Sequence, residues 1–209
     1  MILYRRCLQF SYYEKLSNEK LICLDKQIPF ELPESWRYER LGNICFITRG
    51  SSPRPIKNFL TEEDDGLNWI KIGDTERGGK YIFSTKEKIR PEGIAKTRYV
   101  HSGDFLLTNS MSFGHPYILK TNGCIHDGWL VIENVEAVFC QDYLYYMLSS
   151  SIIYDSLNML ATGSTVKNLK SDSVKSLMVP IPPRRDQERI AKRVETLFII
   201  IDSIEKSLI

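Results

Sequence analysis

The chain has 209 residues, of which 43% are hydrophobic and 26% charged, and its formal net charge is +2. This length predicts one well-cored domain with an accessory element, and the balanced composition excludes a disordered or fibrous chain. No stretch reaches the roughly 18 uninterrupted apolar residues of a membrane span, and Met1–Leu8 lacks the apolar core of a signal peptide, so we expect a cytoplasmic protein. The five scattered cysteines have no C-x-x-C spacing and are expected to be buried, reduced thiols.

Positive charge is concentrated in two segments. Residues 77–98 carry seven Lys or Arg against two Glu, and residues 165–193 carry eight against three acids, whereas residues 62–65 are a compact acidic run. Basic strips of this kind neutralise phosphates in nucleic-acid-binding proteins. The alternative is an ordinary solvated surface, which runs of charge often form.

Residues 1–27 read as an N-terminal extension without a clean hydrophobic period. The prolines of residues 28–36 favour an extended lead-in to a domain that begins near Trp36. Short runs rich in β-branched and aromatic residues then alternate with Gly, Pro, Asn and Asp, which predicts a sheet with long loops. The expected strands are 42–48, 67–72, 80–83, 104–108, 117–119 and 128–132. The polar loop 49–66 has a length that is more often functional than idle.

The second half of the chain turns to helical patterns. Residues 142–148 carry apolar side chains at i and i+4, which predicts an amphipathic helix packed on the sheet. A small-residue loop (161–168) and a last strand (176–180) follow, and the strand ends at the prolines of residues 180–183. A final helix has an a/d seam of 4-3-4-3-4 spacing, formed by Ile190, Val194, Leu197, Ile201, Ile204 and Leu208. The seam predicts a partner helix, the alternative being that this helix packs on its own domain.

The marks of common catalysts are missing from the sequence. It contains no G-x-G-x-x-G, G-x-S-x-G or H-E-x-x-H motif. The segment Gly73–Tyr81 departs from a P-loop, because Lys80 is one position late and Tyr81 stands where a Ser or Thr binds Mg²⁺. For His126 with its neighbour Asp127, a structural or DNA-contacting role is favoured over a metal or general-base role. We therefore expect no catalytic residue and no metal site.

Four stretches of the sequence together carry a family resemblance. They are Leu32–Trp36 with Arg40–Gly42, Gly50-x-x-Pro53 and Trp69-Ile70-x-x-Gly73-Asp74; Gly103-Asp104-x-Leu106-Leu107 with Phe113-Gly114; Gly163–Thr165 with Asn168-Leu169; and Val179-Pro180-x-Pro182-Pro183-x-x-x-Gln187-x-x-Ile190-Ala191. In this order, over residues 28–209, they resemble the specificity subunits of type I restriction-modification systems.

The resemblance implies an α+β fold. It would be a mixed, mostly antiparallel β target-recognition domain with a few helices at residues 28–183, followed by a long C-terminal coiled-coil spacer helix at residues 184–209. The resemblance also implies sequence-specific binding of double-stranded DNA at a split site. Catalysis would come from methyltransferase subunits, which use S-adenosylmethionine, and an endonuclease subunit, which uses ATP and Mg²⁺. The chain itself would need no cofactor.

Members of the family usually carry two recognition domains and two spacer helices, whereas this chain has one of each, as in a half-length subunit. We therefore expect a homodimer with antiparallel spacer helices that reads an interrupted palindrome. One alternative is a half-subunit that binds no DNA and acts as an interaction or inhibitory module through its helix. A stand-alone nuclease would need a clustered metal site, which the sequence does not display.

Base recognition needs donors and acceptors that reach base edges, while Lys, Arg and backbone amides hold phosphates. We expect both kinds of group in loops on one face of the sheet. The candidates are Arg49, Ser51, Ser52, Arg54, Lys57, Arg77, Lys80, Thr108, Asn109, Ser110, Ser112, His115, Thr165, Lys167 and Asn168. Asn109 is expected to pair with adenine, and Arg54 or Arg77 with guanine.

Overall fold

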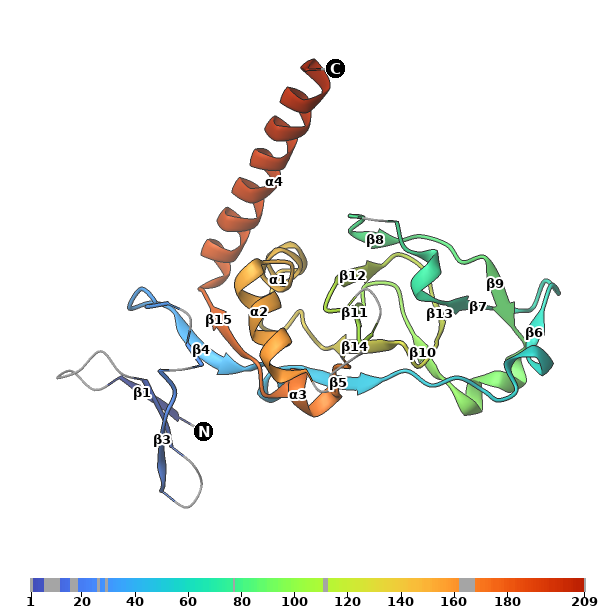
Figure 1. The fold of residues 1–209 in the computed structure, drawn as a ribbon, viewed down its shortest axis with the longest axis horizontal. Coiled ribbons are helices and arrows are strands. Elements are labelled where there is room, and N and C mark those ends of the chain that lie inside the picture. The colour runs from blue at the N-terminus through green and yellow to red at the C-terminus, as the bar shows by residue number, and fades with distance from the viewer. Residues whose placement is uncertain are drawn as a thin grey trace.

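The computed structural model describes residues 2–5, 12–15, 19–25, 27–28, 30–76, 78–110, 113–161 and 168–208. Its N-terminal part is a three-stranded antiparallel sheet of β1 (Ile2–Arg5), β2 (Tyr12–Lys15) and β3 (Leu21–Cys23). The middle of the chain forms mixed sheets, and helices cover one side of them. The molecule is elongated, with β1–β3 near one end and a long C-terminal helix rising from its middle (Figure 1).

Among the described residues, the middle of the chain contains two five-stranded sheets and a two-stranded one. The first has the order β10-β13-β7-β9-β6, the second β5-β14-β11-β12-β8, and β15 pairs with β4. Pairing is antiparallel except for β12 with β8 and β13 with β7. The strands are β4 (Arg37–Arg40), β5 (Phe46–Arg49), β6 (Leu60–Thr61), β7 (Leu67–Ile70), β8 (Tyr81–Ile82), β9 (Glu87–Ile89), β10 (Arg98–Val100), β11 (Phe105–Thr108), β12 (Pro116–Leu119), β13 (Gly123–Ile125), β14 (Trp129–Glu133) and β15 (Met178–Ile181).

The central strands β11, β12 and β14 are buried on both faces. Phe105 and Leu107 join one core with the helices, whereas their neighbour Leu106 joins a second core with Ile70 and Ile125 of the other sheet. Because successive side chains of a strand point to opposite faces, a strand between two cores must be apolar throughout. This explains the unbroken apolar runs FLL and WLVI in the sequence.

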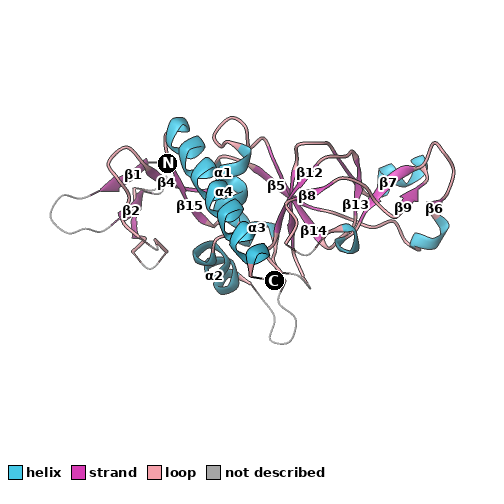
Figure 2. Ribbon diagram, turned by 90° about the horizontal axis from the view of Figure 1, so that it is seen from above, coloured by secondary structure: helices cyan, strands magenta, loops and turns pink. Residues whose placement is uncertain are grey.

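Helices α1 (Gln141–Leu148), α2 (Ser151–Leu160) and α3 (Ser171–Lys175) cover the outer face of this central sheet, and α4 (Arg184–Ser207) follows β15. Seen from above, α4 crosses over α1 (Figure 2). The side chain of Ser150 caps α2 by accepting a hydrogen bond from the backbone of Ile153. The α+β prediction, mostly antiparallel and ending in a long helix, is confirmed.

Several elements differ from the expectation. Residues 42–45 belong to a 3₁₀ turn (η1, Leu41–Asn43) and a bend, so β5 starts at Phe46 and not at Gly42. The loop 49–66 contains a 3₁₀ turn (η2, Ile56–Asn58) and the two-residue strand β6, so it is not structureless. Strands β4, β9, β10 and β13 and helix α3 were not predicted, because each has few residues over which a period can be recognised. Helix α2, with ten residues, was not predicted either.

The last strand returns to the start of the domain. Strand β15 pairs with β4 in the register Tyr38 to Pro180, and the Tyr143 hydroxyl of α1 donates to the Pro180 carbonyl at 3.1 Å. The indole Nε1 of Trp36 donates to Asp186 Oδ2 in the first turn of α4 at 3.3 Å. The first strand of the domain and its final helix are thereby joined.

The buried side chain of Gln187 fixes the base of α4. Its Oε1 accepts from the Cys140 amide at 2.7 Å, and its Nε2 donates to the carbonyls of Val138 at 2.9 Å and Pro182 at 3.0 Å. Only 1% of Gln187 is exposed. Buried backbone groups need such partners, because an unpaired one keeps its full desolvation cost.

The N-terminal sheet is joined to this region by an ion pair. Glu14 accepts hydrogen bonds from Arg40 Nε at 2.9 Å and Nη2 at 2.6 Å, and Arg40 Nη1 donates to the Ser176 carbonyl at 2.8 Å. The hydrogen bond from Arg40 lowers the pKa of Glu14 although burial opposes it. The extension is therefore attached at the seam between β4 and the residues before β15.

The described cysteines are free thiols. Cys45, Cys124 and Cys140 are buried as expected, whereas Cys23 is exposed, because it lies in the N-terminal sheet and not in a core. Burial raises the pKa of Cys45 to about 12 and that of Cys124 to about 11, so both are protonated at neutral pH. Cys7 lies outside the described residues.

Replacing Gln187→Ala should destabilise the fold by about 2 to 3 kcal/mol, because the Cys140 amide and two carbonyls lose their buried partner. Urea unfolding followed by circular dichroism measures the change. The control is Lys192→Ala, an exposed position on the same helix, which should stay within about 0.5 kcal/mol of the wild type. Equal stabilities of the two variants would contradict the anchoring role.

Candidate nucleic-acid interface

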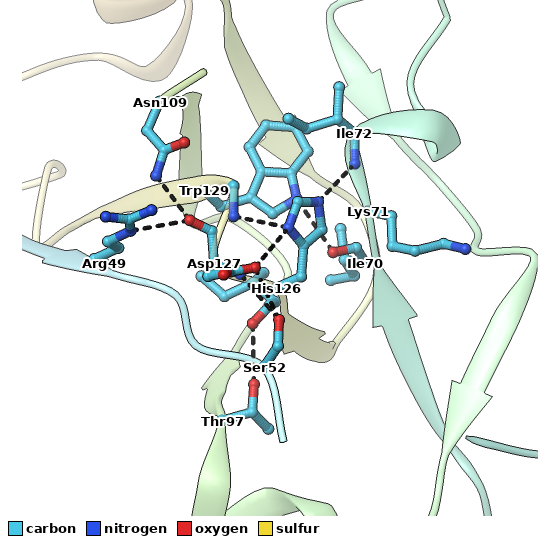
Figure 3. A network of polar contacts seen from close by, with 12 residues as sticks. Arg49, Ser52, Ile70, Lys71, Ile72, Thr97, Asn109, His126, Asp127 and Trp129 are labelled. Carbon is cyan, nitrogen blue, oxygen red and sulfur yellow. Dashed lines mark hydrogen bonds and ion pairs between the residues drawn. The ribbon is translucent and has the colours of Figure 1, made fainter. Parts of the chain in front are cut away.

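Four chain segments meet where the two five-stranded sheets adjoin, and Asp127 lies at their meeting point (Figure 3). The segments are the end of β5 with residues 50–54, the residue after β11, the end of β7 and the turn 126–128 between β13 and β14. The indole Nε1 of Trp129 donates to the Ile70 carbonyl at 3.1 Å and joins the two sheets below this point. Loops from two sheets are thus fixed to one buried base.

Both the backbone and the side chain of Asp127 are engaged. Its carbonyl oxygen accepts from Arg49 Nε at 2.9 Å and from Asn109 Nδ2 at 2.8 Å. Its carboxylate accepts from the Ser52 hydroxyl at 2.9 Å and from Arg54 Nη2 at 3.1 Å. Although partial burial opposes it, the Ser52 hydrogen bond, a backbone hydrogen bond and the charge of Arg54 lower the pKa of Asp127, so this carboxylate is ionised at neutral pH.

His126 links the turn to the end of β7. The Gly128 amide donates to its Nδ1 at 2.7 Å, and the Ile72 amide approaches its Nε2 at 3.1 Å. A neutral imidazole has one unprotonated nitrogen, so the two amides compete for one acceptor, and a protonated ring would offer none. Burial lowers the pKa of His126, although nearby Asp127 opposes this shift. The neutral ring is the form that the fold accommodates.

Gly50 allows the two segments to approach each other. Its amide donates to the Trp129 carbonyl at 2.9 Å, and a Cβ atom at this position would overlap the carbonyl oxygen of His126. Only glycine permits so close an approach of two backbones. The Gly50-x-x-Pro53 motif therefore has a packing reason at its first position.

The first polar loop carries most of the expected side chains to this place. Arg49, Ser52 and Arg54 contact Asp127 directly, and the Ser51 hydroxyl donates to the Lys96 carbonyl at 3.1 Å. Lys57 is exposed in η2. An open groove runs here, lined by residues 52–57 together with Trp69, Lys71, His126 and Asp127.

The expected roles of Thr108 and Asn109 are wrong for this structure. Both side chains are 0% exposed, so neither offers a group to a DNA base. Asn109 has a structural role instead: its amide donates to Asp127, and its backbone oxygen accepts from the Leu169 amide at 2.9 Å. The segment after the small-residue loop is thereby joined to the Asp127 turn. The residue pattern could not reveal that β11 ends below the surface.

Lys80 belongs to a different part of the molecule. Its Nζ lies 2.5 Å from Asp142 Oδ1 and about 5 Å from the ring centroids of Tyr145 and Tyr146 on α1. Burial opposes the charge, but the hydrogen bond and charge of Asp142 outweigh it and raise the pKa of Lys80. With 16% of its side chain exposed, Lys80 joins β8 to α1 and is not a surface phosphate ligand.

The remaining candidates differ in their exposure, and some of them lie outside the described residues. His115 is exposed, and Ser110 and Asn168 are half-buried. Asn168 Oδ1 is a buried acceptor without a hydrogen-bond partner in the described part of the chain. Four further candidates, Arg77, Ser112, Thr165 and Lys167, lie outside the described residues.

Sequence reasoning missed Asp127 as the organiser of the loops and Lys71 as a residue of the groove. The sequence does contain a signal for a turn at this position. Asp127-Gly128 is a turn dipeptide between two strands, and it directly follows a histidine. What it lacks is any indication that residues 49–54, far away in the chain, return to this turn.

The described residues contain neither a metal-binding cluster nor a membrane-spanning helix. No three His, Cys, Asp or Glu side chains among them lie close enough together to hold a metal ion. No helix in the described ranges is both long and apolar enough to cross a membrane.

Solved structures share this fold. The HsdS subunit from Thermoanaerobacter tengcongensis superposes with a TM-score of 0.66 at 20% identity over 86% of this chain and 41% of that one. A second structure, from work on the assembly and conformational transition of the type I R-M system, gives 0.67 at 20% identity over 86% and 42%. This chain thus shares its fold with less than half of each of those two chains.

The chain belongs to the type I restriction modification DNA specificity domain family, which it matches over residues 33–209. It is 22% identical over 184 residues to the EcoKI specificity subunit of Escherichia coli K12, a match to 83% of this chain and 38% of that protein. It is 28% identical over 202 residues to a putative type I specificity subunit of Haemophilus influenzae, covering 96% and 47%. The chain thus spans less than half the length of these relatives.

The pH dependence of stability should reveal the neutral His126 ring. Because its folded pKa lies below that of the unfolded chain, the unfolded state binds the proton first as pH falls. The contribution of His126 is therefore complete above about pH 6.5 and is lost as pH falls towards the folded pKa, with a slope of at most about 1.4 kcal/mol per pH unit. Urea unfolding between pH 7.5 and 5.5 should give a steeper loss for the wild type than for His126→Gln. Parallel profiles would contradict this assignment.

Proposed function

We propose that the chain recognises a sequence in double-stranded DNA as a specificity subunit of a type I restriction-modification complex, and that it is not itself a catalyst. The observation that carries this proposal is the family match, which covers residues 33–209. The Asp127 site supports it, because arginine, lysine and serine side chains of one loop line an open groove there. Arginine and hydroxyl groups are suited to both base edges and phosphates.

The division of labour follows from the family. Methyltransferase subunits with S-adenosylmethionine and an endonuclease subunit with ATP and Mg²⁺ would supply the chemistry in the cytoplasm. This chain would contribute the DNA contact without a cofactor of its own. Its partners would thus be double-stranded DNA and these subunits, and the site would be a split one.

Homodimerisation through α4 is the second part of the proposal. At about 100° per residue, the six seam residues fall within a stripe about 80° wide. The first seam residue, Ile190, packs against the core of its own domain. Further contacts of α4 with this domain lie about 80° away around the helix, at Gln187, Ala191 and Phe198, whose ring stacks on Tyr146 at 6.0 Å. The outer seam residues remain exposed: Leu197, Ile201, Ile204 and Leu208. An apolar stripe that its own domain leaves free fits a second copy of the helix.

Salt dependence tests the DNA contact. The association constant of the full chain for duplex DNA should fall linearly with salt on logarithmic axes, with a slope of about −0.9 per phosphate contact. Lys57→Ala should make this slope shallower by about one if Lys57 holds a phosphate. Fluorescence anisotropy measures both, with Lys206→Ala at the far end of α4 as the control that leaves the slope unchanged. Absence of DNA binding at low salt would refute the proposal and favour the interaction-module alternative.

Sedimentation tests the dimer. At micromolar concentration the chain should sediment at about twice its 24.3 kDa mass. Ile201→Glu places a charge in the seam and should give the monomer, because burying an unpaired charge is costly. Ile199→Glu is the matched control, since Ile199 is equally apolar but lies about 180° around the helix from the middle of the seam. A monomeric wild type, or dissociation by both variants alike, would overturn the seam assignment.

A further inference from the structure

The Asp127 carboxylate is an unexpected group in a loop region proposed to face DNA. A carboxylate repels phosphates, so it would weaken binding if it lay in their path. The structure instead directs both of its oxygens at side chains of the 49–57 loop, Oδ1 to Ser52 and Oδ2 to Arg54. Its charge is thus turned towards the residues that we expect to contact DNA.

The turn that carries Asp127 is held from below. Its carbonyl accepts from Arg49 and from the fully buried Asn109, and its neighbours His126 and Gly128 are bound to each other and to the end of β7. A side chain on such a base can hold its partners in one orientation, which a flexible loop alone does not provide.

Arg54 keeps donors for a second partner. Its side chain is 79% exposed, and Asp127 receives a hydrogen bond from one of its nitrogens, Nη2. A guanidinium has five N–H donors in a fixed fork, and a bidentate contact with guanine needs two. The ion pair is exposed enough to add little to folding stability. What it does determine is the direction in which the fork points.

We infer that Asp127 is a positioning residue for base recognition, which orients Arg54 towards the edges of the base pairs in the DNA groove. This inference rests on the proposed function and adds the residue that gives the loop its selectivity. Orienting Arg54 before binding removes part of the cost of ordering its side chain on DNA. The effect should therefore appear in the preference for the correct sequence and not in general affinity.

The test begins with the full wild-type chain and a pool of randomised duplex DNA, from which the preferred sequence is selected. Affinities for this site and for a scrambled duplex are then measured at one salt concentration. Asp127→Asn keeps an oxygen for Ser52 but removes the charge that holds Arg54. We expect it to lower the ratio of the two affinities by about tenfold, within the range of one base contact, while affinity for the scrambled duplex stays equal or rises.

A double-mutant cycle shows whether Asp127 acts through Arg54. Arg54→Ala alone should lower the ratio by a similar factor, and adding Asp127→Asn to it should have no further effect. Asp65→Asn, in the exposed acidic run 62–65, is the matched control for loss of one negative charge and should leave the ratio unchanged. Thermal unfolding of each variant checks that the fold is kept.

Each outcome decides the matter. A rise of both affinities by the same factor means simple repulsion of DNA, and a fall of both means a structural role; either result overturns the inference, as does an additive cycle. If the wild type selects no sequence at all, the proposed function itself has failed, and the inference falls with it at that first step. Selection by the wild type with an unchanged ratio in Asp127→Asn rejects the inference alone.

Discussion

The pairing of β4 with β15 is the constraint on which the rest of the structure depends. It brings the end of the recognition domain back to its beginning. The prolines after β15 end the strand there, so that α4 starts beside α1 and Trp36. The N-terminal sheet is attached at the same seam through Glu14 and Arg40. Without this closure, neither the core under α1–α3 nor the direction of α4 would be defined.

The closed domain carries its loops at a junction of two sheets. The central sheet is rigid because it is buried on both faces, and the turn 126–128 grows directly out of β13 and β14. Residues 49–54 lie against that turn through Gly50 and Arg49. A few backbone and side-chain contacts thus give this polar loop a defined shape. Recognition of the pattern of donors and acceptors on base-pair edges requires such a shape.

The sequence predicted the elements in which a hydrophobic pattern could be recognised. It did not predict contacts between residues that lie far apart in the chain. Strands β11 and β14 are recognisable as unbroken apolar runs, and α4 by its heptad spacing. The outer residues of this heptad seam are exposed in the structure. Arg49, Ser52 and Arg54 lie close together in the sequence, but the sequence did not identify their common partner Asp127. Asn109 and Lys80 look like surface donors in the sequence, and only tertiary structure shows that one is buried and the other binds α1.

Helix α4 has 24 residues, so at about 1.5 Å per residue its axis is about 36 Å long. It acts as a lever arm, and a tilt of about 5° at its base would move its far end by about 3 Å, close to the 3.4 Å rise of one base-pair step. The contacts of Gln187 and the stacking of Phe198 on Tyr146 hold α4 against its domain at two positions along the helix. Weakening either contact would shift the far end of the helix relative to the loops that we propose contact DNA, even with every contact within the loops intact.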